Sequence, residues 1–256
     1  MSNINDFIDV PVQANEYALL VSALDNALTT ASHQQKQAEL YIQSLDLRPN
    51  FISALVEIAC STEVQPTTQY LAAVHLKNTV VGNWKRRRPG APTVELISAA
   101  EKSHVRDSFQ RLLAVSNRQV LVLNCLTIAK IARSDVPDLW PALIPFLLDA
   151  ACRTSISDPN PGGIGGGSSV DPRSTSPVPM LAALLCLHYV VKEMGSKRLA
   201  ADKAVFTKLA SVLIPPLASR WTETTGQLLV FLKELLHSSL HFHSLGSSSS
   251  SSSSSS

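Results

Sequence analysis

The hydrophobic residues of this chain recur every three or four positions along almost its whole length. Between residues 70 and 84 the apolar positions are Tyr70, Leu71, Val74, Val80, Val81 and Trp84. A similar stripe runs from Val120 to Ile131. This spacing puts apolar side chains on one face of a helix, because an α-helix turns once every 3.6 residues. Alternation of apolar and polar residues never lasts long enough to predict a strand, so the pattern predicts an all-α protein.

The expected helices fall into consecutive pairs that prolines and glycines separate. Three pairs would cover residues 16–30 and 33–46, residues 49–60 and 66–85, and residues 94–115 and 117–133. A fourth pair would open with Asp135 as an N-cap before Pro137 and resume from Pro179 to Met194, and a fifth would begin near Leu199. The repeat length is close to the ~40–47 residues of HEAT and armadillo units. We therefore expect a HEAT-repeat α-solenoid of about four to five helical pairs, each burying one face against the next.

Two stretches of different composition interrupt the helical pattern. Residues 153–179 are rich in Gly, Pro and Ser, and residues 247–256 are ten consecutive serines. Both compositions are typical of disordered segments. The predicted organisation is an N-terminal segment (1–15), HEAT repeats (16–152), a disordered linker (153–179), further HEAT helices (180–243) and a disordered serine tail (244–256). No polar capping repeat closes the array, so we expect a short form or an incomplete version of a longer protein.

Composition and charge narrow the function classes. Apolar residues make up 45% of the chain and charged residues 16%, and 22 basic against 20 acidic residues leave a net charge of +2. That balance argues against a nucleic-acid binder, which gains affinity by neutralising many phosphates. No apolar run reaches the ~18 residues of a membrane span, and the start lacks a signal peptide. The four cysteines are widely spaced, and we interpret them as buried reduced thiols.

No catalytic or cofactor-binding motif is complete in the sequence. The glycine run at 162–167 has P-loop spacing, but Ser168 stands where the lysine must be, and no strand precedes it. The histidines lack HExxH spacing, and no GxSxG element is present. A catalytic triad assembled from residues that are distant along the chain stays an open alternative. We expect no enzyme activity, no cofactor and no metal.

Two features on the expected 66–85 helix have more than one interpretation. The basic run Lys85–Arg88 fits a nuclear-localisation-like or phosphate-binding patch, but cations that complement the helix dipole are the simpler interpretation. Asn78 lies on or beside the apolar stripe, four residues after Val74 and three before Val81. Its amide there needs partners, either in the neighbouring repeat or in a docked protein, and the former is the commoner outcome.

Four motifs in the right order resemble the N-terminal region of the importin-β family of nuclear transport receptors. They are Ala38–Ile42, then Tyr70–Asn78 followed by Trp84–Arg87, then Glu101–Arg106, and then Ile131–Pro145. The run Ser196–Lys203 resembles one branch of that family. The resemblance covers residues 15–225, with the family's N-terminal domain at about 38–113.

The resemblance implies a function and a set of contact residues. Family members are curved solenoids that bind the GTP-bound form of Ran, protein cargo and nucleoporins, and that act in nucleus and cytoplasm and at the nuclear pore. Ran contacts lie largely on the second helices of the N-terminal repeats, on the concave face. By the motif, the Ran-binding candidates are Lys77, Asn78, Trp84, Lys85, Arg86 and Arg87. For Trp84, packing in the core is the competing interpretation. We expect a monomer that does not bind nucleic acid or insert into membranes.

The chain also departs from the family pattern. Gln69 replaces the arginine that usually precedes the Leu-Ala pair, which removes one cation. Family members continue for many more repeats, and these carry most cargo contacts. The alternative function is therefore a HEAT-repeat interaction scaffold, or an inert fragment without Ran or cargo activity.

Overall fold

The computed structural model of the chain describes residues 11–12, 14–29, 32–46, 48–88, 91–152, 178–196 and 200–246. The chain divides into two compact units, Met1–Phe206 and Thr207–Ser256. The linker predicted over residues 153–179 lies outside the described residues, apart from Val178 and Pro179. The ten serines from residue 247 onward also lie outside them.

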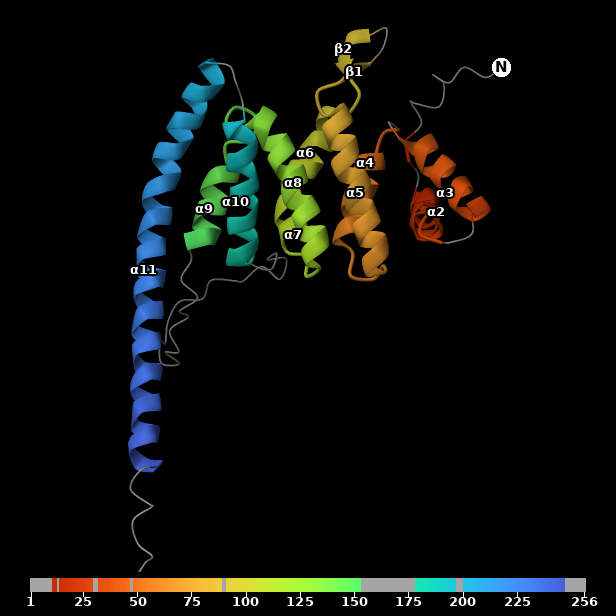
Figure 1. Cartoon of the computed structure of the whole chain (residues 1–256). Coiled ribbons are helices and arrows are strands. Elements are labelled where there is room, and N and C mark those ends of the chain that lie inside the picture. The colour runs from red at the N-terminus through yellow and green to blue at the C-terminus, as the bar shows by residue number, and fades with distance from the viewer. Residues whose placement is uncertain are drawn as a thin grey trace, which may run out of the picture. The chain divides into compact units, whose positions relative to one another are not determined.

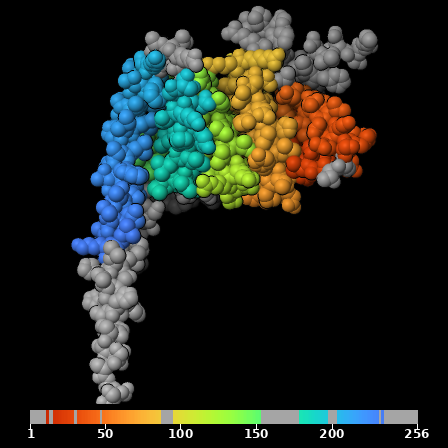
Figure 2. All heavy atoms as spheres, in the orientation of Figure 1, coloured from red at the N-terminus to blue at the C-terminus, as the bar shows by residue number. Residues whose placement is uncertain are grey.

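The first unit is built from helical pairs that follow one another along the chain (Figure 1). The pairs are α2 (Ala14–Asn26) with α3 (Ser32–Leu45), α4 (Phe51–Cys60) with α5 (Pro66–Asn83), α6 (Ala99–Asp107) and α7 (Phe109–Leu113) with α8 (Arg118–Asp135), and α9 (Leu143–Cys152) with α10 (Met180–Gly195). The second helices α5, α8 and α10 pack side by side (Figure 2). This arrangement confirms the predicted all-α architecture of stacked pairs.

The core of this unit lies between the two helices of each pair and between neighbouring pairs. Leu55 of α4, Leu76 of α5, Ile128 of α8 and Leu147 of α9 are buried at positions that the 3.6-residue period selects. Phe109 packs edge-to-face against Trp140 and Phe146, with ring centroids 5.6 and 4.9 Å apart. Edge-to-face pairs bring the positive edge of one ring to the negative face of another, which adds to the area that they bury.

The third pair begins later than predicted. Where a helix was expected from residue 94, β1 (Arg87–Arg88) pairs antiparallel with β2 (Ala91–Glu95) in a short ribbon. Proline at 92 and β-branched residues at 93 and 94 favour an extended chain there. The helix starts instead after Ser98, whose Oγ accepts a hydrogen bond from the Glu101 N–H at 3.2 Å. An N-cap of this kind satisfies a donor at the start of the helix.

The fourth pair also begins later, and the predicted role of Asp135 as its N-cap is wrong. Asp135 is the last residue of α8, and the next helix in the described chain is α9, from Leu143. Val136 is extended, as expected for a residue that precedes a proline, so the chain leaves the helix there. The side chain of Asp135 turns inward instead of capping a new helix, and its contacts form part of the candidate site.

The last helix is α11 (Ala200–Gly246), one long helix where a fifth pair was expected, and its residues 207–246 make up the described part of the second unit. The hydroxyls of Thr222, Thr224 and Thr225 donate to backbone carbonyls four residues earlier, which satisfies them without breaking the helix. The helix includes residues 244–246, the first three of the predicted tail. Among the described residues, no helix combines the length and apolar character needed to cross a bilayer.

Removing a core side chain from α5 tests the packing between pairs. Leu76 is fully buried, so Leu76→Ala should lower the free energy of unfolding by about 2–5 kcal/mol, because it leaves a cavity. The matched change Leu40→Ala removes a side chain that is 65% exposed and should alter stability by less than about 0.5 kcal/mol. Urea denaturation followed by circular dichroism measures both, and equal effects would contradict this burial pattern.

Candidate interaction site at the end of helix α5

The residues predicted from the motif gather on α5 and just beyond its last residue. Lys77 is half-buried, and Asn78 beside it is exposed. Two turns further on, Trp84 is buried with 5% of its surface exposed, and Lys85 and Arg86 are exposed. Arg87 is the first residue of β1, and its side chain lies outside the described part of the chain. The described members therefore divide between one buried ring and several surface groups.

Asn78 differs from its prediction, because it lies away from the apolar stripe of α5. The buried residues of that helix are Thr68, Ala72, Ala73, Leu76, Val80 and Asn83. Asn78 instead lines a groove of about 300 Å³ between α3 and α5, together with His75 and Thr79. Burial lowers the pKa of His75, an effect that Asp46 partly offsets, so the imidazole is neutral at pH 7. Asn78 makes no side-chain hydrogen bond to the described residues, so the groove offers an amide to a partner.

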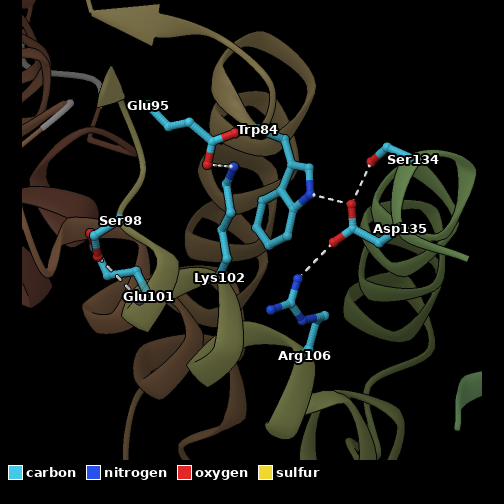
Figure 3. Close-up of polar contacts among 8 residues, drawn as sticks. All are labelled: Trp84, Glu95, Ser98, Glu101, Lys102, Arg106, Ser134 and Asp135. Atoms are coloured by element: carbon cyan, nitrogen blue, oxygen red, sulfur yellow. Dashed lines mark hydrogen bonds and ion pairs between the residues drawn. The ribbon is translucent and has the colours of Figure 1, made fainter. Parts of the chain in front are cut away.

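Trp84 is held by a buried carboxylate from the next repeat (Figure 3). Its Nε1 donates to Asp135 Oδ1 at 3.1 Å, and Arg106 Nη1 lies 2.8 Å from Asp135 Oδ2. Ser134 Oγ donates to Asp135 Oδ1 at 2.9 Å. Asp135 is 3% exposed, and a buried charge is stable only when it is paired and hydrogen-bonded. These contacts fix the end of α5 to α6 and α8.

The face of the Trp84 ring meets a cation that also holds the ribbon. Lys102 Nζ of α6 lies 5.5 Å from the ring centroid and donates to Glu95 Oε2 of β2 at 2.6 Å. A lysine over an indole face is attracted by the ring quadrupole. Both the edge and the face of the Trp84 ring make contacts inside the protein. This position agrees with the interpretation that Trp84 packs in the core.

A second carboxylate links the start of α6 to the start of α4. Glu101 Oε1 accepts the Asn50 N–H at 2.7 Å, and Glu101 Oε2 accepts the Ser98 hydroxyl at 3.0 Å. Asn50 has φ 68°, in the left-handed region that asparagine tolerates better than most residues. The beginning of the third pair is thus anchored on the second.

A groove of about 430 Å³ lies beside Trp84, between α5 and α8. Its walls are formed by Val80, Val81, Trp84, Lys85, Lys130, Arg133 and Ser134. The sequence reasoning missed Lys130 and Arg133, although their three-residue spacing on a predicted helix puts them on one face. Both cations contact Glu193 of α10, Lys130 Nζ at 2.6 Å from Oε1 and Arg133 Nη1 at 3.5 Å from Oε2.

Cys60 and Cys186 do not resemble reactive cysteines. Cys125 and Cys186 are buried as predicted, whereas Cys60 and Cys152 are only half-buried. Burial raises the pKa of Cys60 to about 11, and a hydrogen bond with Cys125 together with burial raises that of Cys186 well above its usual value. A protonated thiol is a poor nucleophile and metal ligand. Within the described part of the chain, no three His, Cys, Asp or Glu side chains gather as a metal site would require.

Comparison with known proteins gives a consistent assignment. Residues 38–114 match the importin-beta N-terminal domain. Importin-11 of Mus musculus is 29% identical over 212 residues, which cover 81% of this chain and 19% of importin-11. The importin beta-like protein kap113 of Schizosaccharomyces pombe is 24% identical over 221 residues, covering 86% of this chain and 19% of that protein. The chain thus spans about a fifth of the length of the curated relatives that it matches.

A solved structure shares the fold. The exportin Cse1 in its cargo-free, cytoplasmic state aligns with a TM-score of 0.63 and 18% identity, over 84% of this chain and 20% of that one. At this identity the likeness establishes the fold alone. It confirms the predicted HEAT-repeat architecture, and the sequence matches agree with the resemblance to the importin-β N-terminal region that the four motifs indicated.

Breaking the Asp135 cluster should destabilise the first unit strongly. Asp135→Ala leaves the Trp84 N–H and the Arg106 guanidinium without their acceptor, and such losses cost about 3–5 kcal/mol. Asp138→Ala, three residues away at an exposed position, should change the free energy of unfolding by less than about 0.5 kcal/mol. Thermal and urea unfolding of the two variants compares them. Similar midpoints would show that the carboxylate does not hold α5 in place.

Proposed function

We propose that this chain, whose residues 38–114 match the importin-beta N-terminal domain, is the N-terminal portion of a nuclear transport receptor and that it binds the GTP-bound form of Ran. Its role is binding, not catalysis. A longer form would carry protein cargo and contact nucleoporins as it moves between cytoplasm and nucleus through the pore. We assign cargo and nucleoporin contacts to a longer form because this chain spans about a fifth of the length of its curated relatives.

The observation that carries the proposal is the set of available polar groups on α5 and just beyond its last residue. Asn78 is exposed, and Lys85 and Arg86 are exposed and form no ion pair with the described residues. Cations on an exposed rim steer an approaching partner and set its orientation more than they add affinity. An amide in a groove gives a directional hydrogen bond, so Asn78 supports specificity.

The remaining candidates play different parts in the same proposal. Trp84 positions the end of α5, since its ring is engaged by Asp135 and Lys102. Lys77 is half-buried beside Asn78, and a lysine can bury its aliphatic stem while its ammonium group stays at the surface. Arg87 extends the basic run into β1. Ran would therefore contact Lys77, Asn78 and the basic run, while Trp84 acts indirectly.

Nucleotide-dependent binding tests the proposal. We expect the purified chain to bind Ran loaded with a non-hydrolysable GTP analogue and to bind Ran-GDP at least about tenfold more weakly, by isothermal titration calorimetry. Asn78→Ala should weaken the GTP-form complex by about two- to tenfold, the value of one hydrogen bond. Charge reversal of Arg86 and Arg87 should weaken it further and reduce its salt dependence.

Arg118→Glu is the matched control for charge reversal. Arg118 is exposed at the opposite end of α8, so the change should leave the affinity for Ran within about twofold. A folded chain that binds neither nucleotide form would reject Ran binding and favour the scaffold or inert-fragment alternative. Selective binding that Asn78→Ala and the reversals leave untouched would reject these contact residues.

A further inference from the structure

Three cations line the groove between α5 and α8. Lys85 lies at the end of α5, and Lys130 and Arg133 lie one turn apart on α8. The side chains of Lys130 and Arg133 are 37% and 40% exposed, so both can reach a molecule in the groove. The Asp135 carboxylate nearby is buried and already paired with Arg106. The acid that faces Lys130 and Arg133 is Glu193 of α10, so these two cations share one carboxylate, and Lys85 forms no ion pair with the described residues.

Glu193 binds Lys130 and Arg133 as the carboxylate of an acidic ligand would. It contacts Lys130 Nζ through Oε1 at 2.6 Å, while its backbone carbonyl accepts a hydrogen bond from Arg133 Nη1 at 3.0 Å. The contacts that Arg133 makes with the described residues, including a short one with Ser196 Oγ, all use Nη1. Nη2 and Nε therefore remain for another acceptor, and a guanidinium fork binds a carboxylate through two such donors.

The groove also has an apolar wall, which narrows the choice of ligand. Val81 is 57% exposed on the α5 side, and Val80 and the Trp84 ring lie behind it. A nucleic acid would need a longer row of cations to bind tightly, and the net charge of the chain is only +2. A peptide can present a carboxylate and an aliphatic side chain together, which matches both walls.

From this geometry we infer that the α5–α8 groove binds an acidic peptide segment of a partner protein, with Lys130 and Arg133 as its carboxylate-binding residues and Glu193 as an internal competitor. One peptide carboxylate takes the open edge of Arg133, a second displaces Glu193 from Lys130, and an aliphatic side chain lies against Val81. The inference goes beyond Ran binding, since the groove recognises this peptide without any nucleotide-bound partner.

Fluorescence anisotropy with a labelled glutamate- and leucine-containing peptide tests the inference on the full chain. We expect binding that weakens as salt rises and that is at least about tenfold weaker for the peptide with glutamine in place of glutamate. The double variant Lys130→Gln, Arg133→Gln should lose about tenfold in affinity. Glu193→Gln should bind about two- to fivefold more tightly, because the competitor has lost its charge.

Lys192→Gln is the matched control, since Lys192 is exposed on α10 next to Glu193 but does not line the groove. Its affinity should stay within about twofold of the parent chain. Equal binding of the glutamate and glutamine peptides, or unchanged binding by the double variant, would overturn the inference. So would weaker binding by Glu193→Gln, or tighter binding of a single-stranded oligonucleotide of equal length. Because Ran is absent from these assays, their failure is distinct from failure of the proposed Ran binding.

Discussion

The carboxylate of Asp135 is the interaction on which the arrangement of the second and third pairs depends. It is buried at the end of α8, accepts the Trp84 N–H and Ser134 hydroxyl, and pairs with Arg106. A charge removed from water in this way is stable only if its partners stay in place, so the cluster penalises any movement of α5 against α6 or α8. Lys85 and Arg86 follow directly after Trp84, so the contacts that fix Trp84 also set their positions.

The proposed binding surface adjoins the groups that hold it, and Trp84 and Ser134 belong to both. Each helix of the stacked pairs buries one face, and the second helices leave another face at the surface, as repeat architectures generally do. Asn78 on α5 and Lys85 just beyond its end belong to that surface, and Lys130 and Arg133 belong to it on α8. Lys130 and Arg133 also contact Glu193, and these ion pairs link α8 to α10. Neighbouring repeats thus provide both the scaffold and the charges of the candidate site.

Local patterns predicted the helices, while the site depends on contacts between distant residues. The hydrophobic period located the pairs, and four short motifs indicated the resemblance to the importin-β N-terminal domain. The ribbon was missed, although proline and β-branched residues at 92–94 signal an extended chain. Asp135 before Val136-Pro137 resembles an N-cap locally, but its partner Trp84 lies 51 residues earlier. The same limit hid the pairing of Arg133 with Glu193, 60 residues later, because no single-sequence pattern reports such distances.

A double-mutant cycle between Trp84 and Asp135 tests most directly whether this buried contact holds the site. Trp84→Phe removes the N–H donor while keeping an aromatic ring, and Asp135→Ala removes the acceptor. The free energies of unfolding of the two single variants and the double variant give the coupling energy. Coupling of about 1–3 kcal/mol is predicted for a buried hydrogen bond to a carboxylate. Additivity within about 0.3 kcal/mol would contradict the account, because the two side chains would then contribute independently.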